Sequence, residues 1–420
     1  MTLLENFKKR VADIGFRNTV SLILKNKVYR HVDRLFLVVG KRLWKNAPLR
    51  DTLVLESHND FDCNGGAFYD YLIENGYNER YRIVWLIKHK KPRHLPKNVQ
   101  CFNIFRPSLR KTYHICTAKY LSCDDVITEK VRPEQKSFYL THGVFGLKDV
   151  RGKIMIPESV DYVLAASPLL DTYEAEQISI SRHAERLIHV GLPCHDLLLG
   201  ALTGELKKVT DGSFDKVILW MPTFRKSDDG KRNDSAGDVV FDVPAIDTLE
   251  EYEAVNRALA AHNTLLIIKL HPMQNVTHLQ IGDRSHIVVL TRDLVKEKGI
   301  DNYRLMRECD ALISDYSSAV YDYLQLGRPV AFVFSDLQTY KLGVAVPEFG
   351  DFEFFVPGEV IKDGRDLASF IAAVADGRDD YREKREELRS ALFQYRDTHS
   401  AQRLADFMGL SRDKGDIASA

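Results

Sequence analysis

Four short polar motifs follow apolar runs in this chain, and each contains side chains that can move a proton or hold an anion. Histidine accepts protons near neutral pH, while arginine, lysine and serine donate hydrogen bonds to phosphate oxygens. Together they predict phosphate chemistry assisted by a base. The motifs are Thr141-His142-Gly143, Pro222-Thr223-Phe224-Arg225, Lys269-Leu270-His271-Pro272 and Ser314-Asp315-Tyr316-Ser317-Ser318.

The first motif supplies the candidate base. His142 is followed at once by Gly143, which lets the backbone bend or approach a ligand closely. An imidazole on such a hinge is well suited to accept a proton from a hydroxyl group. The alternative is a buried histidine with a purely structural role.

The other three motifs predict a site for a diphosphate. Arg225 can grip a phosphate with its planar guanidinium group. Lys269 and His271 are separated by one residue, so on a strand they share one face. Ser317 and Ser318 precede a helical segment, whose first N–H groups attract anions. The alternative for the serines is an ordinary helix cap.

Signals for metals and cofactors are weak. Asp60-Phe61-Asp62 is a DxD triplet, which we interpret as loop acids and not as metal ligands. The chain has no P-loop, no GxGxxG, no Cys/His cluster with zinc spacing and no GxSxG nucleophile. We therefore expect neither a metal nor a cofactor. The six cysteines form no CxxC pair, which is typical of reduced thiols in the cytosol.

Short apolar runs that alternate with helical segments must position these motifs. This alternation predicts an α/β fold with parallel sheets, in which ligands bind outside the carboxyl ends of the strands. Helices are expected at 250–262, 303–308 and 319–326. Strands are expected at 53–55, 81–87, 137–141, 162–166, 187–190, 217–221, 265–270, 287–290, 310–314 and 329–334.

The length of 420 residues allows two ordinary domains. We expect an N-terminal helical segment at 1–50, an acceptor domain at 51–208, a donor-binding domain at 209–410 and a disordered tail at 411–420. The 59 basic and 59 acidic residues balance, which disfavours nucleic acid as a partner.

The charge is nevertheless uneven. Residues 1–50 hold 12 Lys/Arg and 3 Asp/Glu, so their net charge is 12 − 3 = +9. Leu4, Phe7, Val11 and Ile14 recur at helical spacing beside basic residues. This pattern predicts an amphipathic segment on an anionic membrane surface, at the cytoplasmic face of the membrane. The alternative is a helix packed on the body with a solvated basic face. No stretch has the ~18 apolar residues of a membrane span.

Several motifs, in order between about Asp51 and Pro357, resemble the CDP-glycerol glycerophosphotransferase family, the polymerases and primases of teichoic acids and capsule polymers. DYSSxxxDY followed by GRPVxF is the most specific of them. FDCNGGAFYDYL also resembles the segment before the acceptor-side helix. The other matching stretches are LTHGVFGLKDV, HVGLPCHD, MPTFRK, IIKLHP and ISDYSSAVYDYLQLGRPVAFVFSDLQTYK.

The resemblance implies a glycosyltransferase-B architecture, two Rossmann-like domains around a cleft. It also implies transfer of glycerol phosphate or ribitol phosphate from a CDP-activated donor to a lipid-linked or polymer acceptor, with CMP as leaving group. His142 matches the general base and His271 the histidine on the donor diphosphate. The expected donor-binding residues are Gly143, Thr223, Arg225, Lys269, Ser317, Ser318 and Asp322.

The chain departs from the family pattern at two places. Thr141, Val144 and Phe145 flank the HG pair where tryptophan, threonine and proline are frequent. Cys194 replaces the arginine of GLPR, which removes one expected phosphate contact. Two rival functions remain: a glycosyltransferase of the same architecture that uses a nucleotide sugar, and a non-catalytic nucleotide-binding scaffold at the membrane.

Overall fold

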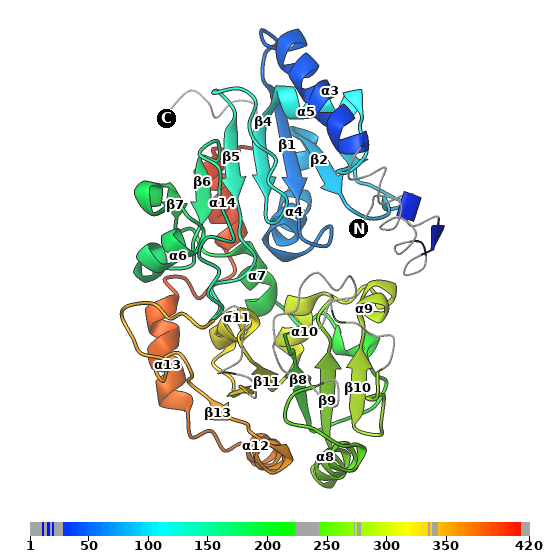
Figure 1. Cartoon of the computed structure of the whole chain (residues 1–420), viewed down its shortest axis with the longest axis vertical. Coiled ribbons are helices and arrows are strands. Elements are labelled where there is room, and N and C mark those ends of the chain that lie inside the picture. Colours follow the sequence, from blue (N-terminus) through cyan, green and yellow to red (C-terminus); the bar gives the residue numbers. More distant parts are fainter. Residues whose placement is uncertain are drawn as a thin grey trace. The chain divides into compact units, whose positions relative to one another are not determined.

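The computed structural model describes residues 11, 15–16, 19–20, 28–223, 243–272, 274, 279–334, 337 and 343–412. Two sheets with helices around them form the fold (Figure 1). The first sheet has seven strands in the order β3-β2-β1-β4-β5-β6-β7. Its strands are β1 (Arg50–Glu56), β2 (Arg82–Ile87), β3 (Val99–Asn103), β4 (Ala118–Cys123), β5 (Lys136–Tyr139), β6 (Tyr162–Leu164) and β7 (Leu187–Ile188).

The second sheet has six strands in the order β10-β9-β8-β11-β12-β13. Its pairs are parallel, as are the pairs from β3 to β6 in the first sheet. This confirms the predicted α/β class with two parallel, Rossmann-like sheets. The strands are β8 (Lys216–Trp220), β9 (Thr264–Lys269), β10 (Ile287–Leu290), β11 (Ala311–Ser314), β12 (Val330–Phe332) and β13 (Glu359–Val360).

Helices connect the strands, and several begin at side-chain caps that the sequence supplies. The Thr248 side chain accepts a hydrogen bond from the backbone N–H of Glu251, and the Glu251 side chain accepts one from the backbone N–H of Thr248. Helix α8 therefore starts with a capping box. The longer helices are α3 (Arg30–Leu43), α4 (Cys63–Glu74), α5 (Leu109–Thr117), α8 (Leu249–Ala261), α12 (Gly364–Asp376), α13 (Arg382–Leu392) and α14 (Ser400–Met408). The shorter ones are α6 (Asp171–Gln177), α7 (Pro193–Leu199), α9 (Arg292–Lys298), α10 (Asn302–Glu308), α11 (Ala319–Tyr323), and the 3-10 turns η2 (Tyr77–Glu79), η3 (Pro168–Leu170), η4 (Ser181–Arg186), η5 (Leu206–Lys208) and η6 (Leu324–Leu326).

The strand interiors are continuous apolar runs, as buried parallel strands require. In the second sheet, β9 is buried along its whole length, and its Leu266 and Ile268 join a core with Ile218 and Trp220 of β8. In the first sheet, Val54 packs in the core with residues of β2, β4 and α5. The sheets are therefore rigid platforms for the loops at their ends.

The strand order reverses next to β1 in the first sheet and next to β8 in the second. β1 lies between β2 and β4, and β8 lies between β9 and β11. In open parallel sheets the connections on the two sides of such a switch point diverge and leave a crevice at the carboxyl ends of the strands. The residues after β1, β4, β8 and β11 therefore occupy the favoured positions for a ligand site.

The predicted boundary at residue 208 follows the division between the sheets, since β1–β7 precede it and β8–β13 follow it. The two compact units of the structure do not coincide with the predicted domains. Unit 1 is 1–142, 157–163 and 408–420, and unit 2 is 143–156 and 164–407. Near the C-terminus, Arg80 donates to the carbonyl of Ser411 at 3.1 Å, while 413–420 of the expected tail lie outside the described residues.

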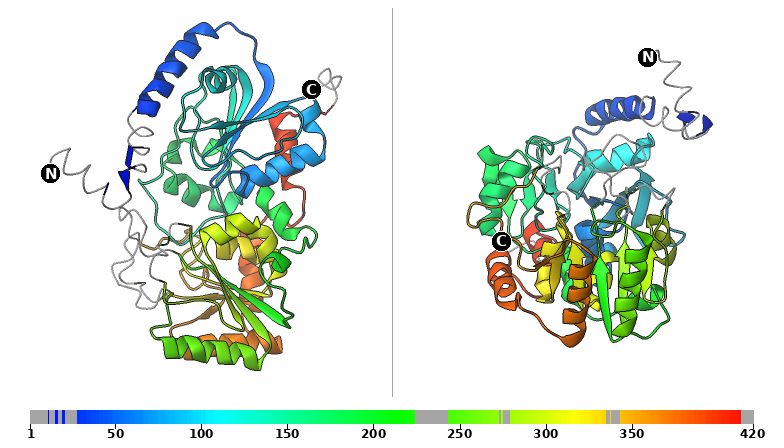
Figure 2. Two further views of the ribbon diagram at one scale, coloured as in Figure 1. Left: turned by 90° about the vertical axis from the view of Figure 1, so that its right-hand side faces the viewer. Right: turned by 60° about the horizontal axis from the view of Figure 1, so that its bottom comes forward.

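The N-terminal segment is helical where the structure describes a long stretch of it, at α3. This helix packs beside α5 (Figure 2). At Gly40 a β-carbon would lie 2.7 Å from Thr112 and 3.1 Å from the sulfur of Cys116, so glycine permits the close approach. Most of the expected helical residues before Val28 lie outside the described residues. Among the helices that are described, none is long and apolar enough to cross a membrane.

Candidate active site

Polar side chains converge at the switch point of the first sheet. The first-sheet cluster comprises Glu56 at the end of β1, His58 after it, Lys88 after β2, Asp124 and Asp125 after β4, and His142 after β5. Lys88 pairs with Glu56 at 2.7 Å and also with Asp125. The backbone N–H of Asp125 donates to Glu56 at 3.1 Å. These contacts hold the strand ends together beneath His142.

His142 sits on a sharply bent stretch of backbone. Its neighbours Thr141 and Gly143 both have positive φ angles, 55° and 114°. A β-branched residue such as threonine rarely adopts that conformation, and such strain concentrates at functional sites. The bend begins shortly after β5 ends at Tyr139, so the imidazole stands beyond the carboxyl edge of the sheet.

One ring nitrogen of His142 is fixed by the backbone. Its Nδ1 lies 3.0 Å from the carbonyl oxygen of Asp124. Because a carbonyl oxygen only accepts, Nδ1 must carry the hydrogen and donate it. The lone pair of the neutral ring is then on Nε2. The side chain is exposed, so the basic nitrogen belongs to an accessible ring.

The surroundings of His142 favour the neutral ring. Crowding by protein atoms lowers the pKa of His142 below its usual 6.5, although part of the side chain keeps contact with solvent. The ring of His58 stacks on that of His142 with 5.6 Å between centroids and adds to the effect when charged. His58 forms an ion pair of 3.7 Å with Asp125, which raises the pKa of His58. The cluster therefore places a histidine with a raised pKa beside one with a lowered pKa.

Gly143 connects this histidine to the second sheet. A β-carbon on Gly143 would lie 2.7 Å from the Oγ of Ser318 and 3.0 Å from a carboxylate oxygen of Asp322. At Gly146 it would lie 2.9 Å from the carbonyl oxygen of Tyr316. Only glycine fits these positions without a shift. The segment after His142 is thus seated directly on the start of α11.

The switch point of the second sheet is tied together by short polar contacts. Thr223, after β8, donates its backbone N–H to Asp315 at 3.0 Å, and its hydroxyl donates to the same carboxylate. Ser314 at the end of β11 donates to the carbonyl of Met221 at 2.7 Å. Thr223 and Asp315 are buried. Their contacts join the ends of β8 and β11 under the serine motif.

The two serines play different parts. Ser317 Oγ accepts a hydrogen bond from the backbone N–H of Ala319 at 3.3 Å, although Ser318 and not Ser317 is the N-cap residue of α11. Ser318 makes no side-chain cap, and its hydroxyl lies against Gly143. Both serines retain partial exposure.

Asp322 lies below them in a buried network. Its carboxylate accepts from His195 Nε2 at 2.8 Å and from the hydroxyl of Tyr303 at 3.4 Å. Gln325 places its amide nitrogen 3.3 Å from His195 Nδ1 and donates it to the carbonyl of Tyr395. An amide N–H can only donate, so Nδ1 accepts in this arrangement and Nε2 faces the carboxylate. Asp322, 2% exposed, therefore contacts His195 in place of solvent.

Cys194 adjoins this network. Its sulfur, a nitrogen of His195 and an oxygen of Asp322 lie within 4.8 Å of one another, close enough to surround a metal ion. Burial, however, raises the pKa of the Cys194 thiol well above its usual value, and a metal requires the thiolate. The imidazole and the carboxylate already bind each other. The group fits a hydrogen-bond network better than a metal centre.

Three predicted donor-site residues remain, and they differ in burial and in whether the structure describes them. Lys269 is buried as the last residue of β9, and His271, half-buried, lies two residues beyond it. The expected common strand face is therefore interrupted by the end of β9. Arg225 lies in 224–242, outside the described residues.

The two aspartates of the DxD triplet accept hydrogen bonds from backbone N–H groups of their own loop and of a neighbouring one. Asp60 accepts from the backbone N–H of Lys88 at 2.7 Å and of His89 at 2.8 Å. Asp62 accepts from the backbone of Asn59 at 2.9 Å. These contacts agree with the interpretation of both residues as loop acids.

Sequence reasoning missed most of the first-sheet cluster and His195. Asp124 and Asp125 follow β4, whose sequence AKYLSC mixes polar and apolar residues and was not predicted as a strand. Glu56 and Lys88 did follow predicted strands, and their positions after those strands were the available signal. His195 lies at the start of α7, in the HVGLPCHD stretch that contributed to the family resemblance, but no role was assigned to it.

Comparison with protein families shows which family this chain belongs to. Residues 41–409 match the family described as CDP-Glycerol:Poly(glycerophosphate) glycerophosphotransferase. The chain belongs to this family. The match extends through both sheets and includes His142, Ser317 and Ser318. It confirms the resemblance seen in the motifs and identifies the chain as a member of a phosphotransferase family.

Curated relatives of this glycerophosphotransferase-family chain act in teichoic acid synthesis. The chain is 26% identical over 374 residues to the teichoic acid ribitol-phosphate polymerase TarK of Staphylococcus aureus, covering 83% of this chain and 66% of that protein. It is 24% identical over 322 residues to a teichoic acid ribitol-phosphate primase of Bacillus spizizenii, covering 70% of this chain and 76% of that protein. A poly(glycerol phosphate) polymerase of the same organism is 24% identical over 353 residues, covering 78% of this chain and 84% of that protein.

Solved structures confirm the fold class. Two structures of the wall teichoic acid polymerase TagF superpose with TM-scores of 0.70 and 0.67, at 17% identity, and cover 97% of this chain and 98% of that chain. At this identity the likeness concerns the fold. The family member described here thus has the two-sheet architecture of TagF, as expected for a glycosyltransferase-B-like protein.

Proposed function

We propose that this chain transfers glycerol phosphate or ribitol phosphate from a CDP-activated donor to a lipid-linked or polymer acceptor, in the synthesis of a teichoic-acid-like or capsule polymer. The observation that carries the proposal is the arrangement of His142 and Gly143. The neutral imidazole has its lone pair on Nε2, the residue is exposed, and Gly143, the next residue along the chain, lies against Ser318.

His142 is the proposed general base. An acceptor hydroxyl attacks the phosphorus that carries the polyol, and its proton passes to Nε2 of His142. A new P–O bond to the acceptor forms as the P–O bond to CMP breaks, and CMP departs with the bond's electron pair. A positioned general base contributes roughly 10²–10⁴-fold to such a step. The hydrogen bond from Nδ1 to Asp124 keeps the ring in the required tautomer.

The donor diphosphate is proposed to bind at the carboxyl end of the second sheet. Ser317 and Ser318 offer hydroxyl groups, and His271 and Arg225 supply charge or N–H donors there. Fixed donors aimed at developing charge are often the largest catalytic contribution. Thr223, Lys269 and Asp322 are buried, and we assign them to support this surface from within.

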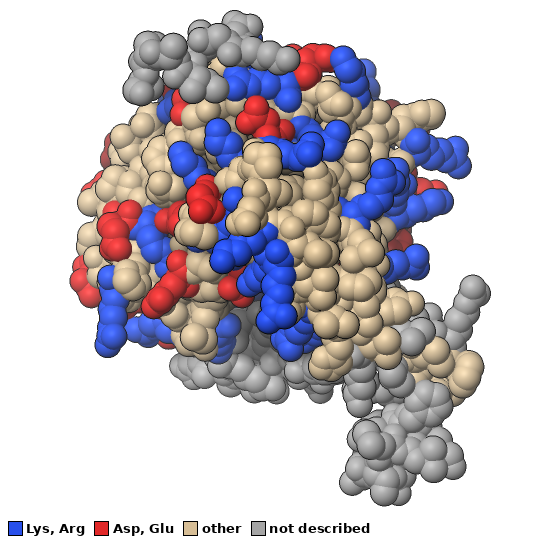
Figure 3. Space-filling model, turned by 90° about the horizontal axis from the view of Figure 1, so that it is seen from above, with Lys and Arg blue, Asp and Glu red and all other residues tan. Residues whose placement is uncertain are grey.

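Peripheral binding to the membrane is proposed through α3. Leu35 and Leu43 on this helix are 58% and 67% exposed, and basic residues such as Arg34 and Arg42 accompany them. Figure 3 shows the molecule from above and has basic and acidic side chains interspersed with uncharged surface. Exposed apolar and basic groups on one helix are typical of binding at an anionic bilayer surface.

A direct assay tests the reaction. The purified chain is incubated with CDP-glycerol or CDP-ribitol and a lipid-linked polyol-phosphate acceptor, and the products are identified by mass spectrometry. We expect the acceptor to gain one or more polyol-phosphate units with release of CMP. UDP-sugars serve as the rival donors, and transfer of a sugar from them without transfer from either CDP-polyol would refute the proposal.

A further inference from the structure

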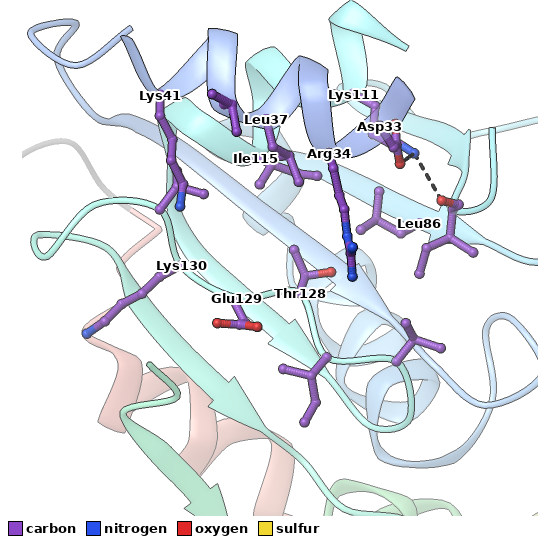
Figure 4. A pocket seen from close by; sticks show the side chains of 15 residues that line it. Asp33, Arg34, Leu37, Lys41, Leu86, Lys111, Ile115, Thr128, Glu129 and Lys130 are labelled. Atoms are coloured by element: carbon purple, nitrogen blue, oxygen red, sulfur yellow. Dashed lines mark hydrogen bonds and ion pairs between the residues drawn. The ribbon is translucent and has the colours of Figure 1, made fainter. Parts of the chain in front are cut away.

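A cavity of about 470 Å³ lies beneath α3 (Figure 4). Its size is within the range of small-molecule sites. α3 lines one side, and residues 126–131 after β4 line another. Most of the lining is aliphatic: Leu37, Val38, Leu86, Ile104, Ile115, Val126, Ile127 and Val131.

The charged groups of the lining favour an anion. Four basic residues (Arg34, Lys41, Lys111 and Lys130) and two acidic ones (Asp33 and Glu129) line the cavity, a net charge of 4 − 2 = +2. Lys111 pairs with Asp33 at 2.6 Å. Lys130 pairs with Asp161. Glu129 accepts from the hydroxyl of Ser159 at 3.0 Å.

Arg34 and Lys41 are the lining cations that can bind an anionic ligand. Neither forms an ion pair with another residue in the part of the chain that the structure describes, and both are exposed. They are seven residues apart, two helical turns, and therefore share a face of α3 with Leu37 between them. In Figure 4 the side chain of Arg34 descends from α3 toward the cavity and that of Lys41 descends on the other side of Leu37. The cavity thus combines an apolar interior with two unneutralised cations at its rim.

The cavity is continuous with the exposed apolar face of α3. Val38 lines the cavity and is also 54% exposed. Val39, its neighbour, is 40% exposed. An apolar pocket that opens onto an apolar surface with basic residues suits a molecule with a hydrocarbon chain and an anionic head, and does not suit a soluble polyol phosphate.

The same loop connects the cavity to the candidate base. Residues 126–131 follow directly on Asp124 and Asp125, and Asp124 holds His142 through its carbonyl. The backbone N–H of Val126 donates to Glu56 of the first-sheet cluster at 3.0 Å. Two residues span at most about 7 Å, so the near end of the cavity is close to the place where an acceptor hydroxyl would react.

We propose that this cavity binds the lipid end of the acceptor, one hydrocarbon chain together with the phosphate attached to it. The proposal rests on the proposed function, because it assigns the anchor of the same acceptor. The aliphatic lining takes the chain, and Arg34 and Lys41 bind the phosphate. With the lipid held there, the polyol end of the acceptor extends along residues 124–126 toward His142.

Binding is tested first with dodecyl phosphate, titrated into the full chain below its micelle concentration by calorimetry. One molecule should bind per chain, while dodecanol and inorganic phosphate, which each lack half of the ligand, should bind at least about tenfold more weakly. Equal binding of inorganic phosphate would indicate a simple anion site and overturn the lipid assignment.

Matched charge variants locate the site. Arg34→Gln with Lys41→Gln removes the two rim cations, and Arg30→Gln with Arg42→Gln removes two other exposed cations of α3 that do not line the cavity. The first pair should weaken dodecyl phosphate binding at least about tenfold, and the second should leave it unchanged. The same loss in both pairs would mean general adsorption to a basic helix and would refute the cavity.

A cavity-filling variant links the site to transfer. Ile127→Trp should raise KM for a lipid-linked acceptor while kcat with a short soluble polyol-phosphate acceptor stays at the wild-type value, and the soluble reaction also verifies that the variant is folded. Unchanged KM for the lipid-linked acceptor would overturn the inference. If the wild-type chain transfers to neither acceptor, the proposed function fails, whereas the calorimetric comparison still decides whether the cavity binds a lipid phosphate.

Discussion

Gly143 and Ser318 approach so closely that a β-carbon on the glycine would lie 2.7 Å from the serine hydroxyl. The contact places the residue after His142 on the first residues of the α11 region. The residue that follows the proposed base therefore contacts a serine of the proposed donor site. Because glycine alone fits, the contact explains the HG pair in physical terms.

Gly143→Ala should therefore impair transfer more than an alanine substitution at a glycine that has a positive φ but no close neighbour. Its φ of 114° disfavours any L side chain, and the added methyl group also meets Ser318 and Asp322. Steady-state assays should show a fall in kcat of at least about tenfold, which corresponds to a barrier increase of about 1.4 kcal/mol.

Gly152→Ala is the matched control. Gly152 also has a positive φ, 71°, but a β-carbon there would have nothing within 4 Å. This variant should lose about 1–2 kcal/mol of stability from the backbone term and keep its kcat. If both variants lost activity equally, the contact with Ser318 would have no special role.

His142→Ala should abolish the proton transfer and leave the donor site in place. We expect kcat to fall roughly 10²–10⁴-fold because the general base is gone. Calorimetric titration with the CDP-polyol should give a Kd close to that of the wild type. His94→Ala, at an exposed histidine of the same unit, should change neither quantity. A near-normal rate in His142→Ala would exclude the base role.

The fold was largely predictable because the strands are short apolar runs separated by helical segments. Ile287–Leu290 was predicted at its full extent, and the predicted strand at 265–270 differs from β9 by one residue at each end. β3 and β4 were missed, since sequences such as VQCFN and AKYLSC lack a clear period. Their place in the sheet is set by pairing with β2 and β1, which no local pattern reveals.

The site was predictable only in part, for a similar reason. His142, Ser317 and Ser318 stand in motifs with specific spacing, and these motifs carried the family resemblance. His58 and Asp125 are 67 residues apart and meet only because β1 and β4 are neighbours. His195 and Asp322 are likewise brought together by tertiary packing. Contacts of this kind depend on sheet order, so sequence spacing does not predict them.

The pH dependence of kcat/KM should reflect the lowered pKa of His142. A general base works in its neutral form, so the rate is retained above the pKa and lost as the pH falls through it. Because crowding by protein atoms and then the neighbouring His58 lower this pKa, the acidic limb should lie below pH 6.5. Asp125 and Asp62 oppose the shift. A pH–rate profile with a soluble acceptor measures the limb.

His58→Gln should move that acidic limb to higher pH. The substitution removes a cation stacked 5.6 Å from the His142 ring and leaves Asp125 without this partner, and both changes favour protonation of His142. His89→Gln is the control, because His89 pairs with Asp60 at 3.1 Å, a different carboxylate from the one that faces His58. An acidic limb that stays in place in His58→Gln would contradict the electrostatic coupling of the two histidines.

His195→Ala should destabilise the chain strongly, because it leaves the Asp322 carboxylate buried without its closest donor. The two side chains are 4% and 3% exposed and lie 2.8 Å apart. Removal of one partner from a buried pair costs about 3–5 kcal/mol. His189→Ala breaks a pair with Asp171 of nearly equal length, 2.7 Å, whose side chains are 21% and 33% exposed. That loss should be at most about 1 kcal/mol, because water solvates the remaining carboxylate. Urea denaturation of both variants gives the comparison, and similar losses would show that burial does not set the strength of the His195–Asp322 pair.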